Sequence, residues 1–140
     1  MSQSNNNNTT EKEGTANYVE LIIYRLPKKN HDAMIQLNNQ FIGIFKEHGI
    51  LQWEVFQLAS DQSMEPFTNV SKAISVNQDD EVWLEKLSYR NRDHRTEVMR
   101  KIQSDKNCEQ GFKQFMSLIT PRSSVIHGDF SLLQGQGFVK

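Results

Sequence analysis

Five polar side chains lie in segments where apolar and polar residues alternate: Glu20, Tyr24, Glu54, His127 and Asp129. Side chains alternate between the faces of a strand, so residues two or four apart share a face. An imidazole beside a carboxylate can take up a proton near neutral pH, because histidine titrates at about pH 6.5. We therefore predict that these five residues line a small-molecule pocket, with His127 as a base. No spacing assigns a catalytic residue.

Two alternatives remain open for the same residues. A half-covered sheet face always carries some polar groups, which can be solvated or paired with one another. A metal could also be bound by His127, Asp129 and Glu54. No tight ligand spacing such as His-x-x-x-His supports that interpretation, so we expect no metal and no cofactor.

The elements that would position these residues follow from hydrophobic periodicity. Alternation and β-branched or aromatic content predict strands, and apolar residues three and four apart predict helices. The predicted strands are 18–26, 50–59, 67–76, 81–89 and 124–133, and the predicted helices are 30–48, 92–104 and 108–119. The polar residues 77–80 are expected to join two strands in a hairpin. This order predicts an α+β domain with helices on one face of an antiparallel sheet.

The first strand has two apolar sides, and we expect Val19, Leu21 and Ile23 to pack on the helices. The opposite face would then expose a larger apolar set: Ile22, Tyr24, Phe56, Leu58 and Val125. Such a patch is larger than monomers usually expose. We predict that a second copy of the chain covers it. The alternative is cover by the N-terminal tail or the C-terminus.

Composition excludes several classes of partner and compartment. The chain has 16 Lys and Arg against 17 Asp and Glu, a net charge of -1, which disfavours nucleic-acid binding. A basic cluster at 90–101 is interleaved with acids, so we interpret it as a solvated helix face, with RNA association as the weaker alternative. The single cysteine, Cys108, cannot form an intrachain disulfide, and no segment is long and apolar enough for a membrane span. We expect a cytoplasmic protein with no nucleic-acid or membrane partner.

Polar composition also divides the chain. Residues 1–17 hold an Asn run and only two apolar residues, Met1 and Ala16, so we expect a disordered tail. The remainder, 18–140, is predicted to form one domain. We interpret Cys108 as incidental and His48 as a residue at a helix end.

Several segments resemble the YbaA-like family of uncharacterised bacterial and archaeal proteins. The resemblance rests on Phe45–Leu51, Glu54, Ala59–Asp61, Asp80–Leu84 and Ile126–Phe130, and it extends from Tyr18 to about Leu133. It implies a ferredoxin-like fold of the dimeric α/β-barrel superfamily, in which two sheets pair face to face. Family patterns before the second helix and before the last strand are replaced here at 89–91 and 120–124.

These observations together predict a homodimeric domain that binds a small molecule in a cavity between the helix-free sheet faces and has no established reaction. The alternative is a cofactor-independent monooxygenase or isomerase acting on a hydrophobic small molecule, as the resemblance implies for some superfamily members.

Overall fold

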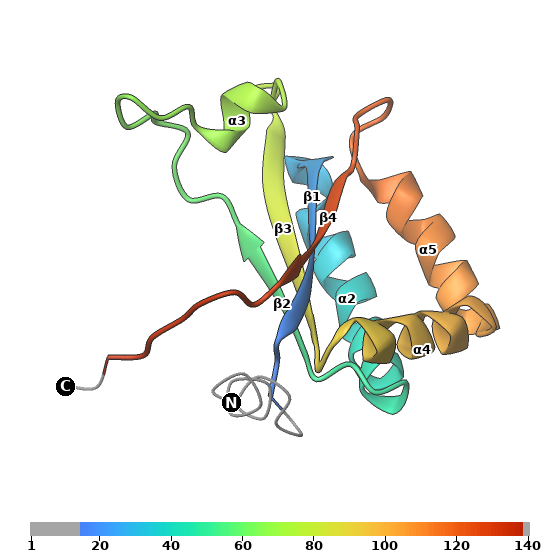
Figure 1. Cartoon of the computed structure of the whole chain (residues 1–140). Coiled ribbons are helices and arrows are strands. Elements are labelled where there is room, and N and C mark those ends of the chain that lie inside the picture. The colour runs from blue at the N-terminus through green and yellow to red at the C-terminus, as the bar shows by residue number, and fades with distance from the viewer. Residues whose placement is uncertain (1–14, 139–140) are drawn as a thin grey trace.

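The chain folds into a sheet with a layer of helices on one face, seen in a computed structural model that describes residues 15–138. Its elements in order are β1 (Tyr18–Pro27), the short 3-10 helix η1 (Lys28–Asn30), α2 (His31–Glu47), β2 (Gln52–Gln57), α3 (Val70–Ala73), β3 (Asp80–Tyr89), α4 (Arg92–Gln103), α5 (Lys106–Leu118) and β4 (Ile126–Ser131). Helices α2, α4 and α5 lie on the same side of the sheet (Figure 1). The predicted α+β class is confirmed.

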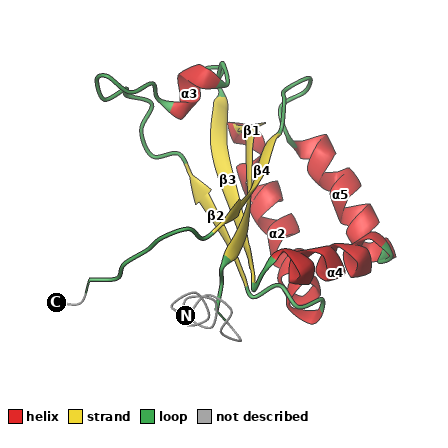
Figure 2. Ribbon diagram, viewed as in Figure 1, coloured by secondary structure: helices red, strands yellow, loops and turns green. Residues whose placement is uncertain are grey.

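Within residues 15–138 the sheet has four strands in the order β2-β3-β1-β4, and every neighbouring pair is antiparallel. The strand β1 is central and pairs with both β3 and β4, so it carries residues to the middle of both faces. Figure 2 shows the strands as one twisted layer, with the short α3 beyond the end of the sheet and away from the main helix layer.

Side-chain caps define where α4 and α5 begin. Asn91 precedes α4 and accepts a hydrogen bond from the backbone N–H of His94, and Asp105 precedes α5 and accepts one from Asn107. Each cap satisfies a backbone donor that the first helical turn leaves without a partner. After the end of α2, Gly49 has φ 98°, a conformation that glycine adopts without strain.

The prediction of which β1 face packs on the helices is wrong. Tyr24 and Leu26 are fully buried and belong to the core cluster with Met34 and Leu37 of α2. Residues 19, 21 and 23 lie on the opposite, helix-free face. The alternation shows which residues share a face, but β1 is apolar on both sides and the pattern does not choose the face that helices cover.

The predicted strand 67–76 and its hairpin are also wrong. Residues 58–79 instead connect β2 to β3 as an excursion that contains the single-turn helix α3. The Asn69 side chain accepts from the backbone N–H of Ser71 and donates to the carbonyl oxygen of Ser60. Asparagine competes with strand pairing through such local hydrogen bonds, and the apolar content of the segment did not reveal them.

The helix-free face carries an apolar row that crosses all four strands. Register pairs Phe56 with Leu84, Leu84 with Ile23, and Ile23 with Ile126. The edge residues of this row are well exposed, Phe56 at 47 % and Ile126 at 43 %, and Phe130 on the same face is exposed at 55 %. An apolar face open to solvent is therefore present, as predicted. Of the expected residues Phe56 lies on it, whereas Ile22, Tyr24 and Val125 lie on the side of the helices.

Candidate functional site

An apolar pocket of about 450 Å³ lies between the sheet and the helix layer. All four strands or their flanks and all three main helices contribute to it. The lining residues are Glu20, Ile22, Asn38, Phe41, Phe45, Trp53, Glu85, Leu87, Met99, Ile102, Cys108, Phe112, Phe115, Met116, Val125 and His127. The walls are thus mainly aromatic and aliphatic, and a few polar groups come from the sheet. This composition is typical of small-molecule sites.

Two aromatic pairs form much of the wall. Phe41 stacks on Phe45 with ring centroids 5.1 Å apart, and Phe112 stacks on Phe115 at 6.4 Å. Gly111 permits the close approach of α5 to α2, because a Cβ atom at this position would collide with the ring of Phe41. Phe112 is 61 % exposed, so the pocket opens to solvent along α5.

A buried carboxylate anchors a polar cluster at the sheet side of the pocket. Glu20 accepts hydrogen bonds from Arg95 Nη2 at 3.0 Å and from the hydroxyl of Tyr89 at 3.1 Å. The Nε2 atom of His127 lies 2.6 Å from Glu20 Oε2. Arg95 also lies 3.4 Å from a carboxylate oxygen of Asp129, so one guanidinium bridges two acids.

The charge state of Glu20 follows from this arrangement. Burial by itself raises the pKa of the Glu20 carboxyl, but the hydrogen bond and charge of Arg95, helped by His127 and Tyr89, outweigh burial and leave the pKa lowered. The pKa of the Tyr89 hydroxyl is raised, first by burial and then by the negative charge of Glu20. Glu20 is therefore an anion at neutral pH that is held in place by its partners.

Glu85 is a second carboxyl group on the pocket lining, with the opposite behaviour. Glu85 is 8 % exposed, and Trp53 Nε1 donates a hydrogen bond to its Oε1 atom at 3.0 Å. Burial raises the pKa of Glu85, the Trp53 hydrogen bond opposes the rise, and the charge of Glu20 adds to it. Two neighbouring acids in one pocket thus have their pKa values displaced in opposite directions, which is a recurring feature of functional sites.

Replacing Glu85 by glutamine is expected to change how stability depends on pH. The folded-state pKa of Glu85 is raised above the ordinary 4.5, so its contribution to stability is present below that value and is lost as pH rises through the folded pKa. Glu85→Gln removes this loss, which amounts to about 1.4 kcal/mol for each unit of displacement. Urea unfolding between about pH 4 and about pH 8 should show that the free energy of unfolding of the variant rises relative to that of the wild type as pH rises. Glu54→Gln is the control, and a constant difference between wild type and Glu85→Gln would contradict the expectation.

The structure brings three of the five predicted site residues together. Glu20 and His127 line the pocket, and Asp129 lies beside His127, with 3.4 Å between His127 Nε2 and Asp129 Oδ1. Tyr24 shares their face of the sheet but is packed in the core, edge-on to Phe115 at 4.8 Å. That these residues bind a ligand stays a prediction.

Glu54 does not join the set. It lies on the helix-free face and pairs with Lys86 across the strands, with 3.9 Å between Lys86 Nζ and Glu54 Oε1. Its neighbour Trp53 faces the pocket instead. The predicted placement of the pocket on the face opposite the helices is therefore wrong, for the same reason as the assignment of the β1 faces.

Sequence reasoning missed the partners that define the electrostatics. Arg95 belongs to the cluster interpreted as a solvated helix face, but it turns toward the sheet and its side chain is only 23 % exposed. Glu85 lies between Trp83 and Leu87 on the same face of β3, and a polar residue between two bulky apolar ones was the available signal.

A metal ion would meet competition in this polar cluster. One ligand atom from each of Glu20, His127 and Asp129 lies within 4.8 Å of the others. Both acids, however, are already paired with the guanidinium of Arg95. A divalent cation would have to displace that charge or lie beside it.

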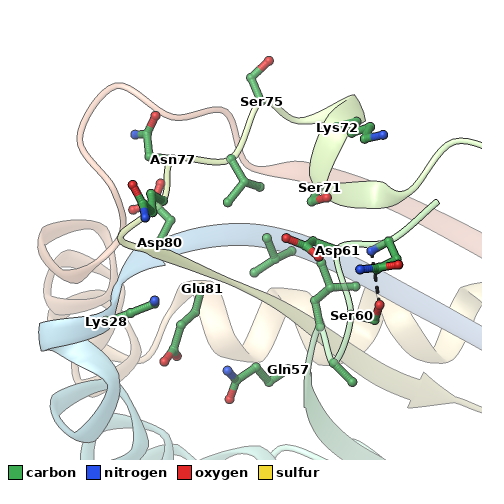
Figure 3. A pocket seen from close by; sticks show the side chains of 16 residues that line it. Lys28, Gln57, Ser60, Asp61, Ser71, Lys72, Ser75, Asn77, Asp80 and Glu81 are labelled. Carbon is green, nitrogen blue, oxygen red and sulfur yellow. Dashed lines mark hydrogen bonds between the residues drawn. The ribbon is translucent and has the colours of Figure 1, made fainter.

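A larger and more polar hollow, about 840 Å³, lies between β2, the start of β3 and the excursion 58–79. Figure 3 shows its lining, in which Lys28 and Lys72 occur together with Asp61, Asp80 and Glu81. Charges of both signs are spread around this space, and it lacks the aromatic walls of the apolar pocket. We therefore regard the apolar pocket as the better candidate site.

Comparison with known proteins gives a family without an assigned activity. The family model described as "Protein of unknown function (DUF1428)" matches residues 17–118. No curated protein matches the chain. The name and superfamily implied by the sequence resemblance stay predictions. Among residues 15–138, none of the helices combines the length and the apolar character needed to cross a membrane.

Proposed function

We propose that this chain, which belongs to the DUF1428 family of proteins of unknown function, binds a hydrophobic aromatic small molecule in the apolar pocket. The observation that carries the proposal is the combination of stacked phenylalanine walls with two buried carboxyl groups, Glu20 and Glu85, on the sheet side. A pocket of about 450 Å³ has the size of a drug-like molecule's site. We assign no reaction.

The polar groups indicate the chemistry of the ligand. Glu20 is an anion already neutralised by Arg95, so a second full charge on the ligand is not required for balance. Burial raises the pKa of Glu85, so its carboxyl takes up a proton at higher pH than an exposed glutamate does, and in that form it can donate a hydrogen bond. His127, 47 % exposed at its side chain, stands at the edge as a further donor or acceptor. An aromatic molecule with a single uncharged polar group, such as a carbonyl or hydroxyl, fits these requirements.

Two chains pairing through the helix-free faces form the second part of the proposal. The strand order and the alternation of strands and helices are compatible with a ferredoxin-like subunit, and the apolar row Phe56–Leu84–Ile23–Ile126 supplies a surface that water solvates poorly. Burial of such a surface contributes about 25 cal/mol per Å² and favours association with an identical face. In this arrangement the pockets of the two subunits lie on the outer sides of the paired sheets.

Binding is tested with an uncharged aromatic dye, Nile red, whose fluorescence rises in apolar surroundings. Phe112→Ala removes an exposed part of the pocket wall and is expected to weaken dye binding at least about tenfold, because burial of an aromatic contact by the dye contributes about 1.5–3 kcal/mol. Phe130→Ala is the matched control, since Phe112 and Phe130 have similar exposures of 61 % and 55 % on opposite sides of the sheet. Dye binding that is lost in Phe130→Ala and kept in Phe112→Ala would rule the pocket out.

A further inference from the structure

We infer that the chain carries a divalent-metal site of the zinc class, formed by His48, Asp105 and Cys108 where the end of α2 meets the start of α5. One candidate ligand atom from each of these residues, a nitrogen, an oxygen and a sulfur, lies within 4.8 Å of the other two. The site is separate from the polar cluster of Glu20 and does not depend on the proposed ligand of the pocket.

The backbone positions the three side chains from two helix ends. His48 is the C-cap residue of α2, Asp105 is the N-cap residue of α5, and Cys108 follows Asp105 by three residues on the first turn. An N-cap side chain lies over the first turn of its helix, and ligand atoms of Asp105 and Cys108 both lie within 4.8 Å of the His48 imidazole at the end of α2. His48 Nε2 already lies 2.7 Å from Asp105 Oδ2.

The donor set matches the preferences of zinc. Neutral imidazole, carboxylate and thiolate are its usual protein ligands, and three of them with one open position is the pattern of reactive zinc sites. Binding would convert Cys108–SH and M²⁺ into Cys108–S⁻–M²⁺ and a released proton, and it would replace the hydrogen bond between His48 and Asp105 by two metal–ligand bonds. No electron transfer is involved.

Solvent access and the lack of a competing cation among the described residues both favour metal binding at this cluster. The His48 and Asp105 side chains are 16 % and 19 % exposed, so an ion can enter from solvent, whereas Cys108 is 5 % exposed and closes the inner side. Among the described residues, the ion-pair partner of Asp105 is His48, and no arginine or lysine is paired with it. The cluster of Glu20, His127 and Asp129 differs in this respect, because Arg95 pairs with both of its acids.

The position of Cys108 links the inferred site to the apolar pocket, because Cys108 is one of the residues that line it. An ion bound here would therefore stand at the edge of the pocket. His48 and Asp105 are 57 positions apart in the chain, and only the packing of α2 against α5 brings the ligands together.

Cobalt titration of the full chain, purified and freed of metal with a chelator, tests the site. Co²⁺ bound to a thiolate gives a charge-transfer band in the near ultraviolet, so the wild type is expected to develop this band and to lose it when Zn²⁺ is added. Cys108→Ser should abolish the band, and Asp105→Asn, which keeps an oxygen for the helix cap, should weaken Co²⁺ binding at least about tenfold.

His127→Ala is the matched control, because it removes a ligand from the other cluster and should leave the band unchanged. Absence of the band in the wild type overturns the inference, and that measurement does not depend on how any variant folds. A band that persists at unchanged affinity in both His48→Ala and Asp105→Asn would also overturn it, since the cysteine would then bind the ion without the other two residues.

Discussion

Replacing Arg95 by alanine is expected to destabilise the domain by about 3 kcal/mol, which corresponds to a fall in Tm of roughly 10 °C. The substitution removes the permanent positive charge beside Glu20, whose side chain is 8 % exposed, and leaves it with the hydrogen-bond partners His127 and Tyr89. The cost comes from the uncompensated charge in a buried position and not from the net value of the ion pair. Thermal unfolding followed by circular dichroism measures the effect.

The pH dependence of this loss identifies its cause. The pKa of Glu20 is lowered in the folded protein, so its contribution to stability is present above the unfolded value of 4.5 and is lost as pH falls through the folded pKa. The difference between wild type and Arg95→Ala should therefore be large at neutral pH and shrink on acidification. Arg100→Ala on the same helix is the control, because Arg100 is 73 % exposed and its contact with Glu97 is 4.0 Å long. Equal effects of the two substitutions would contradict the assigned role of Arg95.

The sequence predicts the long elements of this fold because their patterns are local. The helical spacing of Met34 and Leu37, with Gly49 after the helix, suffices to place α2, and the β-branched and aromatic content of residues 18–26 suffices to place β1. The strand prediction for 67–76 is wrong because the hydrogen bonds of the Asn69 side chain outweigh the strand preference of the apolar residues in this segment. Local hydrophobicity contains no information about those partners.

The candidate site was predictable only in part, because its contacts join distant segments. Glu20 and His127 could be proposed from their shared alternation, but their pairing spans 107 positions, and the contact of Glu20 with Arg95 spans 75. The choice between the two faces of the sheet depends on which one receives α2, α4 and α5. The packing of Tyr24 and Leu26 against residues of α2, Met34 and Leu37, decides which face is covered. The pattern of a single strand does not contain this information.

The substitution Ile23→Glu is expected to abolish the proposed dimer while leaving the subunit folded. Register places Ile23 between Leu84 and Ile126 in the row that crosses the helix-free face, so a charge at this position is centred in the proposed interface. In a monomer the introduced carboxylate would be hydrated, and the cost is about 1 kcal/mol of strand propensity. In the dimer each copy would bury an unpaired charge, at a cost of at least about 3 kcal/mol, which weakens association by more than about 100-fold.

Light scattering across a concentration series distinguishes these states directly. The wild type should have the mass of two chains, and Ile23→Glu should have the mass of one with an unchanged circular dichroism spectrum. Ile42→Glu is the matched control, because Ile42 is 50 % exposed on α2, and the same change of residue type there lies on the other side of the sheet. A wild type that stays monomeric at high concentration would refute the pairing of sheets. The apolar pocket would survive that result, because its walls come from one chain, and the dye experiment on Phe112 tests it independently.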